Sequence, residues 1–378
     1  MKIVSQKMKV VQVTTKIGEE RIRYLPDAGA NILGTVIHNT IDEKYRDPTK
    51  DAGQVWTDNI KEQNGIIKSQ PLNKHLLPLE NSNEYLSRKF STVLFANTKA
   101  PISVKLQPKP SKKIRLYGSE ISVYDGVSKS ESQIFGKIDL VEKTKKNGIK
   151  ITDWKSGNII DKDGNVNTGY ETQIKMYAAL HYRLQSIQNP SPLWPKTGIL
   201  ENPITGEKVI IELVEKECLD LLKHSRVLHQ RLANILDMDN SLKSLIKHAN
   251  PSLANCDFCA IRPACKPYRE WLSEELVNHS NETDPKEFVF DVIGNYKSRS
   301  FSSSTEEKGC ILIEDMKSRV WRISNIDFKA SRNHKVLNLM KQGDSIMILN
   351  INSNLRCHLS EVDVSCKANP QTQMIYMN

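Results

Sequence analysis

One stretch in the middle of the chain limits what this sequence can fold into more than any other part of it. Two short apolar segments, 134–141 and 149–154, have the length and composition of β-strands. Between them, the dipeptide Asn147-Gly148 is typical of a tight hairpin turn. A segment with helical periodicity, 170–186, follows after a polar loop. The sequence therefore predicts a β-hairpin that leads into a helix, as part of an α/β domain.

Two aspartates and a lysine lie on this predicted hairpin. Asp139 is inside the first strand, and Asp153 and Lys155 stand on either side of Trp154 at the end of the second. Because side chains alternate along a strand, Asp153 and Lys155 point to the same side, and antiparallel pairing brings Asp139 close to them. Two carboxylates and an ammonium at a sheet edge make a site for a hard metal ion with a lysine beside it. The Asp-x-Lys pattern by itself is weak, since both residues are common at strand ends.

The wider pattern around these residues is more specific. It consists of three short motifs in a fixed order: Gly136-x-x-Asp139, Asp153-x-Lys155 and Gln173-x-x-x-Tyr177. The last places two side chains one turn apart on a helix face. In this form the stretch resembles the RecB-like branch of the PD-(D/E)XK nuclease superfamily, which includes AddB-type and CRISPR-associated exonuclease domains. The resemblance implies a restriction-endonuclease-like core, a central mixed sheet flanked by helices, and hydrolysis of phosphodiester bonds with Mg²⁺ or Mn²⁺.

The resemblance also implies roles for the conserved residue types of the motif. Lys155 would stabilise charge on the phosphate or orient the attacking water. Gln173 and Tyr177 would position that lysine and the nucleic-acid backbone. The alternative for these two is that they are a surface amide and a packed aromatic ring.

A histidine upstream of the hairpin extends the resemblance. A helix predicted from residue 27 carries Gly34-x-x-x-His38, which resembles the histidine motif of the family. The resemblance implies that the metal ligands are His38, the two carboxylates Asp139 and Asp153, and the main-chain carbonyl of Trp154. Since His38 lies beside an apolar stripe, a purely structural role is the alternative.

The charge of the chain permits a polyanionic partner without proving one. Net charge is +10, with a pI of about 9.1. Residues 86–119 hold eight basic residues and no acidic one. This segment is either a solvated face or a track for phosphates. As a track, its nucleic-acid-binding residues would be Arg88, Lys89, Lys105, Lys112, Lys113 and Arg115.

No run of the sequence approaches the roughly 18 apolar residues that a membrane-spanning helix needs. We therefore expect a cytoplasmic protein with no membrane partner. No G-x-x-x-x-G-K-[ST] phosphate loop is present either. Unwinding of a duplex would then have to come from a partner, such as a helicase or another repair or defence protein.

Three cysteines stand close together, at Cys256, Cys259 and Cys265. Thiolates at this spacing can converge on one zinc ion or iron–sulfur cluster. The spacing also resembles the iron–sulfur subset of RecB-like nucleases, in which a fourth cysteine lies far upstream. Here no cysteine precedes Cys218. Three interpretations remain open: an incomplete cluster site, a cluster or zinc site completed by a residue such as Cys218 or His224 or His248, and a remnant without metal.

The composition changes after a polar segment with Pro285. We predict a nuclease domain over 1–275 that includes the cysteine motif, a linker over 276–286, and a small β-rich domain over 287–378. In this last part, alternating apolar and polar residues predict five strands, with one helix before the fourth. That order suggests a small barrel, of OB-like type. Of its aromatic residues, Tyr296 and Phe301 could stack on bases, whereas Trp321 is better explained as core.

Taken together, the sequence predicts a metal-dependent deoxyribonuclease that acts on single-stranded or frayed DNA in repair, recombination or defence. The competing hypothesis is a non-catalytic nucleic-acid-binding module that keeps the fold. The presence of Asp139, Asp153 and Lys155 together argues against it. An RNA substrate stays open, because nothing in the sequence reads a 2′-hydroxyl group.

Overall fold

The computed structural model describes six parts of the chain: 29–69, 77–101, 115–126, 134–238, 249–278 and 291–376. Within them, short gaps lie at 83, 145–147, 162, 257–258, 260–261, 263–264, 302–307, 317, 329–339 and 356–363. The described residues fall into two compact units. The first lies within Gly29–Ile67 and Leu76–Asn234, and the second contains the described residues from Ile235 onward. None of the described helices is long and apolar enough to cross a membrane.

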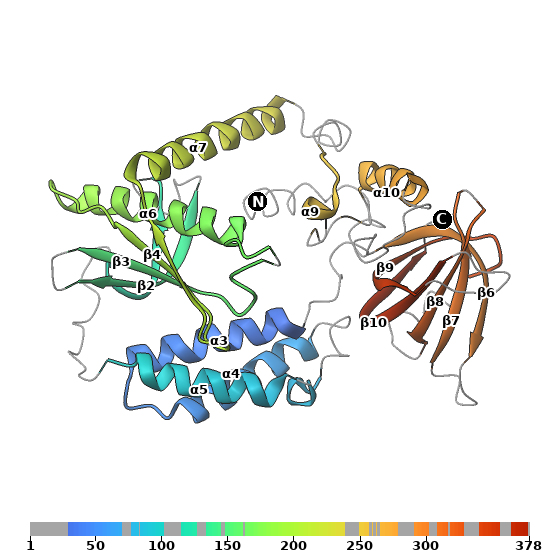
Figure 1. Cartoon of the computed structure of the whole chain (residues 1–378), viewed down its shortest axis with the longest axis horizontal. Helices are drawn as coiled ribbons and strands as arrows, with labels where there is room; N and C mark the ends of the chain where they lie inside the picture. Colours follow the sequence, from blue (N-terminus) through green and yellow to red (C-terminus); the bar gives the residue numbers. More distant parts are fainter. Residues whose placement is uncertain are drawn as a thin grey trace. The chain divides into compact units, whose positions relative to one another are not determined.

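A five-stranded mixed sheet forms the centre of the first unit (Figure 1). Its strands, in spatial order, are β1 (Gly118–Tyr124), β2 (Phe135–Lys143), β3 (Ile149–Trp154), β4 (Thr197–Glu201) and β5 (Lys208–Glu212). All neighbours are antiparallel except β3 and β4, which run parallel. A parallel pair requires a crossover connection, and helix α6 (Thr168–Gln188) supplies it. The predicted α/β fold with a helix-flanked mixed sheet is confirmed.

The β2–β3 hairpin forms where the sequence predicts it. Leu140 pairs with Thr152 in the register, which places Asp139 and Asp153 next to each other along the two strands. Below the tip, the Thr144 main-chain N–H donates to the Gly148 carbonyl over 2.8 Å, and the Gly148 N–H donates to Thr144 Oγ1 over 3.0 Å. The register of the hairpin therefore fixes the positions of the two aspartates.

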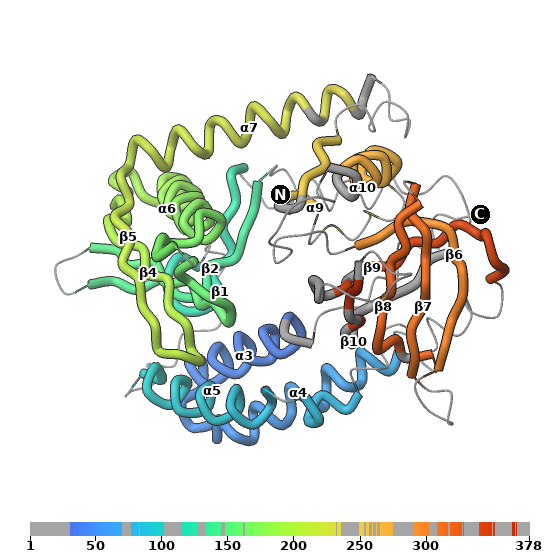
Figure 2. Tube along the Cα trace, turned by 45° about the vertical axis from the view of Figure 1, so that its right-hand side comes forward, coloured from blue at the N-terminus to red at the C-terminus, as the bar shows by residue number. Residues whose placement is uncertain are grey.

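Helices cover both faces of the sheet (Figure 2). Helix α6 packs across β1, β2, β3 and β4. The apolar stripes of three other helices form one core with Leu140 and Trp154 of the sheet. These helices are α3 (Gly29–Arg46), α4 (Ala52–Lys68) and α5 (Tyr85–Lys99), with the short 3-10 turn η2 (Leu79–Asn81) before α5. A long helix, α7 (Glu215–Met238), runs beside α6 and is joined to it by an ion pair of Lys175 with Glu217.

Two strands of the first unit differ from what the sequence pattern predicts. Alternating residues predict separate strands at 113–117 and 120–124, but β1 begins at Gly118, where φ is +105°, and 113–114 lie outside the described residues. A positive φ breaks the strand geometry on its N-terminal side. The pattern also predicts a strand over 194–200, which begins only at Thr197, because Pro195 cannot donate a ladder hydrogen bond. A further strand predicted over 103–106 lies outside the described residues.

The second unit contains a closed five-stranded barrel in the order β10-β8-β7-β6-β9. Its strands are β6 (Val292–Phe301), β7 (Lys308–Glu314), β8 (Val320–Asp327), β9 (Ser345–Leu355) and β10 (Val364–Tyr376). The third and fifth strands pair in parallel, and the first and fourth close the barrel. This is the connectivity of the five-stranded Greek-key barrel of OB type. The β-rich C-terminal domain is confirmed, but its last strand is β10 and not the predicted 355–359, of which 356–359 lie outside the described residues.

The barrel core explains two of its aromatic residues. Trp321 is 1% exposed, and its indole N–H donates to Asp315 Oδ2 over 2.8 Å. Tyr296 is partly buried against the same core. Trp321 is therefore a core residue, as predicted. The helix expected at 333–341 lies almost wholly outside the described residues.

The segment around the cysteines packs with the barrel, whereas the sequence analysis placed it in the first domain. Helices α9 (Leu253–Cys256) and α10 (Lys266–Asn278) belong to the second unit. Tyr268 and Leu272 are fully buried in the barrel's apolar core. Arg262 forms a bidentate ion pair with Asp291, at 2.7 and 3.1 Å, just before β6. These buried contacts are the physical reason why the segment groups with the barrel.

Candidate active site

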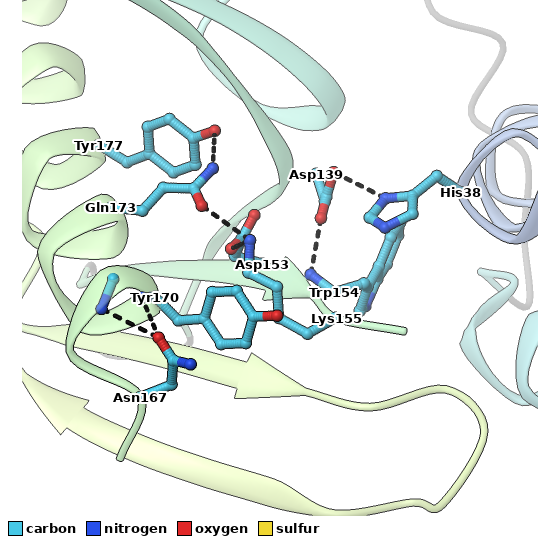
Figure 3. Close-up of polar contacts among 10 residues, drawn as sticks. His38, Asp139, Asp153, Trp154, Lys155, Asn167, Tyr170, Gln173 and Tyr177 are labelled. Atoms are coloured by element: carbon cyan, nitrogen blue, oxygen red, sulfur yellow. Dashed lines mark hydrogen bonds and ion pairs between the residues drawn. The ribbon is translucent and has the colours of Figure 1, made fainter. Parts of the chain in front are cut away.

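The Asp139 carboxylate lies at the centre of the predicted site. One of its oxygens, Oδ2, accepts a hydrogen bond from the Trp154 main-chain N–H over 2.6 Å. The other, Oδ1, lies 3.2 Å from His38 Nδ1 (Figure 3). Asp139 is 6% exposed, so both contacts are shielded from bulk water. The carboxylate thus ties β2 to the end of β3 and to helix α3.

Asp153 and Lys155 project from the end of β3 toward each other, as the alternation of side chains predicts. Lys155 Nζ lies 2.5 Å from Asp153 Oδ2. The approach is an ion pair without the angles of a hydrogen bond, and this buried oxygen accepts no hydrogen bond from a described residue. The main-chain N–H of Lys155 donates to the Glu201 carbonyl over 2.9 Å. Pairing with β4 therefore holds the lysine backbone in place.

Helix α6 surrounds the Lys155 ammonium from the other side. Lys155 Nζ donates to Gln173 Oε1 over 2.8 Å, and Gln173 Nε2 donates to the Tyr177 hydroxyl over 2.6 Å. The ammonium also lies 4.7 Å from the centre of the Tyr170 ring. Figure 3 shows these side chains directed from α6 toward the end of β3. A carboxylate, an amide oxygen and an aromatic face therefore confine one cation.

Two local features position helix α6 next to the site. The side chain of Asn167 accepts hydrogen bonds from the main-chain N–H groups of Gly169 and Tyr170, a helix N-cap that fixes the first turn. Farther along, the Tyr177 ring lies over Gly136 of β2. A Cβ atom at that glycine would stand 2.6 Å from Tyr177 Cε1. The glycine and tyrosine of the two motifs are therefore in direct contact.

Helix α3 brings His38 to the same place. Its N-terminal part approaches the loop after β3 closely, since a Cβ atom at Gly34 would lie 3.0 Å from Ser156 Oγ. The His38 ring also lies 6.4 Å from the Trp154 ring, centre to centre. The small residue one turn before His38 therefore allows the imidazole to reach Asp139.

Burial and neighbouring charges together shift the pKa values of Asp139, Asp153 and His38. Burial, followed by repulsion from Asp139, raises the pKa of Asp153 to about 7. Burial alone would raise the pKa of Asp139, but its hydrogen bond with His38 and the positive charges around it outweigh burial and lower that pKa. For His38, burial lowers the pKa, and the contacts with Asp139 and Asp153 outweigh it and raise the pKa overall. The two carboxylates therefore differ, Asp139 ionised and Asp153 near its midpoint at neutral pH.

The comparison with known families agrees with this geometry. The family model described as PD-(D/E)XK nuclease superfamily matches residues 16–266, more than half of the chain. The chain belongs to this superfamily. Its members are generally nucleases that use divalent metal ions. The match includes all the residues that converge at the end of β3.

Other comparisons add little to the superfamily assignment. No curated protein matches the chain. Among solved structures, the replication Factor A related protein from Methanobacterium thermoautotrophicum is similar, with 15% identity, 26% of this chain and 94% of that chain covered, and a TM-score of 0.18. With so low a score, this similarity carries no argument here.

The superfamily implies a divalent metal ion, and the residues of the site fit one by their chemistry. Carboxylate oxygens, an imidazole and a main-chain carbonyl suit Mg²⁺ or Mn²⁺. The buried Asp153 Oδ2, which has Lys155 Nζ beside it at 2.5 Å, is a carboxylate oxygen of the kind that such an ion prefers. Over the described residues, however, no three His, Cys, Asp or Glu side chains are grouped closely enough to hold an ion. The contact of His38 Nδ1 with Asp139 Oδ1 engages two of the atoms that would bind the ion.

Three members of the predicted phosphate track, Arg88, Lys89 and Arg115, lie in the described residues. Arg88 is mostly buried and pairs with Glu84 at 2.6 Å on α5. Lys89 is half-buried on the same helix. Arg115 donates to the Tyr117 carbonyl over 3.2 Å. The remaining members, Lys105, Lys112 and Lys113, lie outside the described residues, so the predicted phosphate track stays a prediction.

The three cysteines of the predicted cluster, Cys256, Cys259 and Cys265, are free thiols. Burial raises the pKa of Cys256 and of Cys265, and the neighbouring thiols add to this effect. Among the described residues they do not form a metal-binding group, and Cys218 is a buried residue of α7 in the first unit. A cluster or zinc ion held by Cys256, Cys259 and Cys265 therefore stays a prediction.

Two site residues escaped the sequence analysis. Tyr170 lies three residues before Gln173 and seven before Tyr177, so its spacing on the α6 face could have indicated it. Glu201 lies at the end of β4, where it pairs with Lys99 of α5 at 2.8 Å. No sequence signal links Glu201 to the site, because the pairing of β3 with β4 places it there.

Proposed function

We propose that the first unit is a metal-dependent deoxyribonuclease of RecB-like type that hydrolyses phosphodiester bonds in single-stranded or frayed DNA. The observation that carries this proposal is the confinement of Lys155 next to two unequal carboxylates. The ammonium contacts the buried Asp153 and the partly buried Gln173 and Tyr170, which is more than a free surface lysine requires. Repair, recombination or defence against foreign DNA would employ such an activity, with unwinding supplied by a partner such as a helicase.

In this proposal each residue has a chemical role. His38, Asp139, Asp153 and the Trp154 carbonyl would hold Mg²⁺ or Mn²⁺. When bound, the ion would supply a hydroxide near neutral pH and stabilise charge on the scissile phosphate. The Lys155 ammonium stabilises developing negative charge or orients the attacking water. Gln173 and Tyr177 hold that ammonium in one position through the chain of hydrogen bonds along α6.

The competing hypothesis is a binding module that keeps the fold without catalysis. A module of this kind gains nothing from a buried, partly protonated Asp153, since removing a buried charge usually stabilises a protein. The ordering of Lys155 by Gln173 favours catalysis for the same reason, because phosphate binding alone does not require one fixed lysine position.

The test is a cleavage assay on purified protein with end-labelled single- and double-stranded DNA, in Mg²⁺, Mn²⁺ or EDTA. Asp153→Asn and Lys155→Ala should each lower the cleavage rate by about a hundredfold or more, because they remove a ligand or the charge that acts on the phosphate. DNA affinity measured in EDTA should change little. A matched control is Lys175→Ala, which removes a partly exposed lysine of α6 that pairs with Glu171 and Glu217 instead of with the site residues.

Two results would contradict the proposal. One is cleavage at the wild-type rate by either pure variant. The other is wild-type protein that binds DNA but cleaves neither DNA nor RNA in any of the metals, which would favour the binding module. Cleavage of RNA alone would keep the reaction and change the substrate.

A further inference from the structure

The β6–β7 hairpin of the barrel extends beyond the closed part of the sheet. Strand β6 pairs with β9 only up to Asn295, and after a register shift near Tyr296 it pairs with β7 alone as far as Phe301. In a barrel of OB type, the loop after the first strand and the face of strands two and three are where oligonucleotides bind. Here that loop follows Phe301.

An aromatic ring is held in place at the base of this loop. Phe301 is 41% exposed, although it is a large apolar side chain. Its ring meets that of Phe328 edge to face, with centres 5.3 Å apart and planes at 77°. Phe328 is itself 3% exposed and lies over Gly309, where a Cβ atom would come within 2.5 Å of the Phe328 ring. The absence of a side chain at Gly309 therefore leaves room for the Phe328 ring, which contacts Phe301.

A cation accompanies the exposed ring. Arg299 is two residues before Phe301 on β6, so both side chains point to the same side of the strand. The guanidinium carbon lies 5.6 Å from the centre of the Phe301 ring. Arg299 is exposed and forms no ion pair with a carboxylate among the residues that the structure describes. A fixed aromatic face beside an exposed guanidinium combines base stacking with phosphate contact.

We propose that Phe301 and Arg299 form a binding site for single-stranded nucleic acid on the barrel, in which a base stacks on Phe301 and Arg299 contacts the adjacent phosphate. This site is separate from the cleavage chemistry of the first unit. The choice of nucleic acid as ligand rests on the proposed function of that unit. A base is preferred to an apolar peptide because the exposed ring has the Arg299 cation beside it.

The test measures binding of a fluorescein-labelled oligothymidylate to the full chain by anisotropy, in EDTA so that cleavage is blocked. Phe301→Ala should weaken binding about tenfold, since stacking on one aromatic ring contributes that order of affinity. Phe301→Trp should retain or improve it. Arg299→Ala should weaken binding and reduce the slope of log affinity against log salt by about one. Met316→Ala is the matched control, because Met316 is 81% exposed at the other end of β7.

A second readout locates the contact. An oligonucleotide that carries 5-iodouridine should form a photo-crosslink to the peptide that contains Phe301, and the crosslink should disappear in Phe301→Ala. Circular dichroism of each variant shows whether the barrel is folded. Affinity within twofold of wild type for both folded variants, or a crosslink elsewhere with none at Phe301, would overturn the proposal.

The two proposals fail separately. Binding is measured in EDTA, where cleavage is blocked, so the anisotropy readout does not depend on the chemistry of the first unit. Binding that depends on Phe301 in a protein without nuclease activity would retain this site and reject the proposed function. Normal cleavage, together with binding that does not depend on Phe301, would retain the proposed function and reject the barrel site.

Discussion

At the scale of single residues, the site brings acidic and basic groups together in a buried space. Asp139 and Asp153 are both buried, with the His38 imidazole beside Asp139 and the Lys155 ammonium beside Asp153. Because like charges close together cannot both ionise freely, one carboxylate stays ionised and the other keeps a proton to a higher pH. The pKa of Asp153, raised to about 7, records this inequality. A divalent cation bound to both oxygens would relieve it.

This inequality predicts how stability depends on pH without metal. The folded protein holds a proton on Asp153 over a range in which the unfolded chain, with a pKa near 3.8, does not. The resulting stabilisation is complete below the unfolded pKa and is lost as pH rises through about 7. In EDTA, the free energy of unfolding of the wild-type protein should therefore fall by on the order of 1–4 kcal/mol between about pH 5 and pH 8. One pKa unit corresponds to about 1.4 kcal/mol.

Thermal unfolding of three proteins checks this expectation. Asp153→Asn should show a smaller fall in Tm over the same pH range, whatever its absolute stability. Asp163→Asn, which removes an exposed loop carboxylate, should follow the wild-type curve. If Tm falls equally with pH in Asp153→Asn and in the wild type, the prediction that Asp153 holds a buried proton is wrong.

At the scale of elements, the site depends on how one helix meets one hairpin. The Tyr177 ring occupies the space above Gly136, and the chain of hydrogen bonds from Tyr177 through Gln173 ends at Lys155. The absence of a side chain at Gly136 therefore lets helix α6 hold Lys155 in position, through Tyr177 and Gln173. A displacement of the helix by a fraction of an ångström would move the ammonium.

We predict that Gly136→Ala impairs cleavage more than folding. The new Cβ would stand 2.6 Å from Tyr177 Cε1, so the ring must move and with it Gln173. The expected loss in kcat/KM is about tenfold or more, because small displacements of catalytic groups are costly. Steady-state cleavage and circular dichroism measure the two effects.

Gly65→Ala is the control for this substitution. Gly65 lies in helix α4, and an added Cβ would meet nothing within 4 Å. Alanine there should leave activity unchanged and raise stability by about 0.5–1 kcal/mol. Full activity of folded Gly136→Ala protein would show that the contact with Tyr177 does not control Lys155.

At the scale of the whole molecule, the chain divides into a nuclease unit and a barrel unit, and the cysteine segment belongs with the barrel. Arg262 and Asp291 are 3% and 0% exposed, and the Tyr268 hydroxyl donates to the same carboxylate over 2.8 Å. These polar contacts attach Arg262 and helix α10 to the start of the first strand of the barrel.

We predict that Arg262→Met destabilises the barrel unit by about 3–5 kcal/mol, because it leaves the Asp291 charge buried without its partner. Lys266→Met is the control. It removes one member of an exposed ion pair with Glu270 on α10, and should change stability by about 0.5 kcal/mol or less. Denaturant unfolding followed by tryptophan fluorescence measures both. Equal, small effects of the two substitutions would mean that the buried pair does not hold the segment.

The sequence by itself determined the local chemistry of the nuclease unit. Alternation along β3 places Asp153 and Lys155 on one side, the two apolar segments pair as a hairpin, and helical spacing aligns Gln173 with Tyr177. These are short-range consequences of strand and helix geometry, so a reader of the sequence can derive them. The alternation of apolar residues likewise predicted a small C-terminal barrel.

Only the tertiary structure decided which distant residues meet. The contact of Tyr177 with Gly136 and the place of Tyr170 under Lys155 depend on how α6 crosses the sheet. The assignment of the cysteine segment to the barrel depends on Arg262 finding Asp291, and both are polar residues that any loop could carry. The protonation of Asp153 depends on burial near Asp139. Long-range packing sets each of these, and the free energy of packing is shared over many residues, so no local pattern records it.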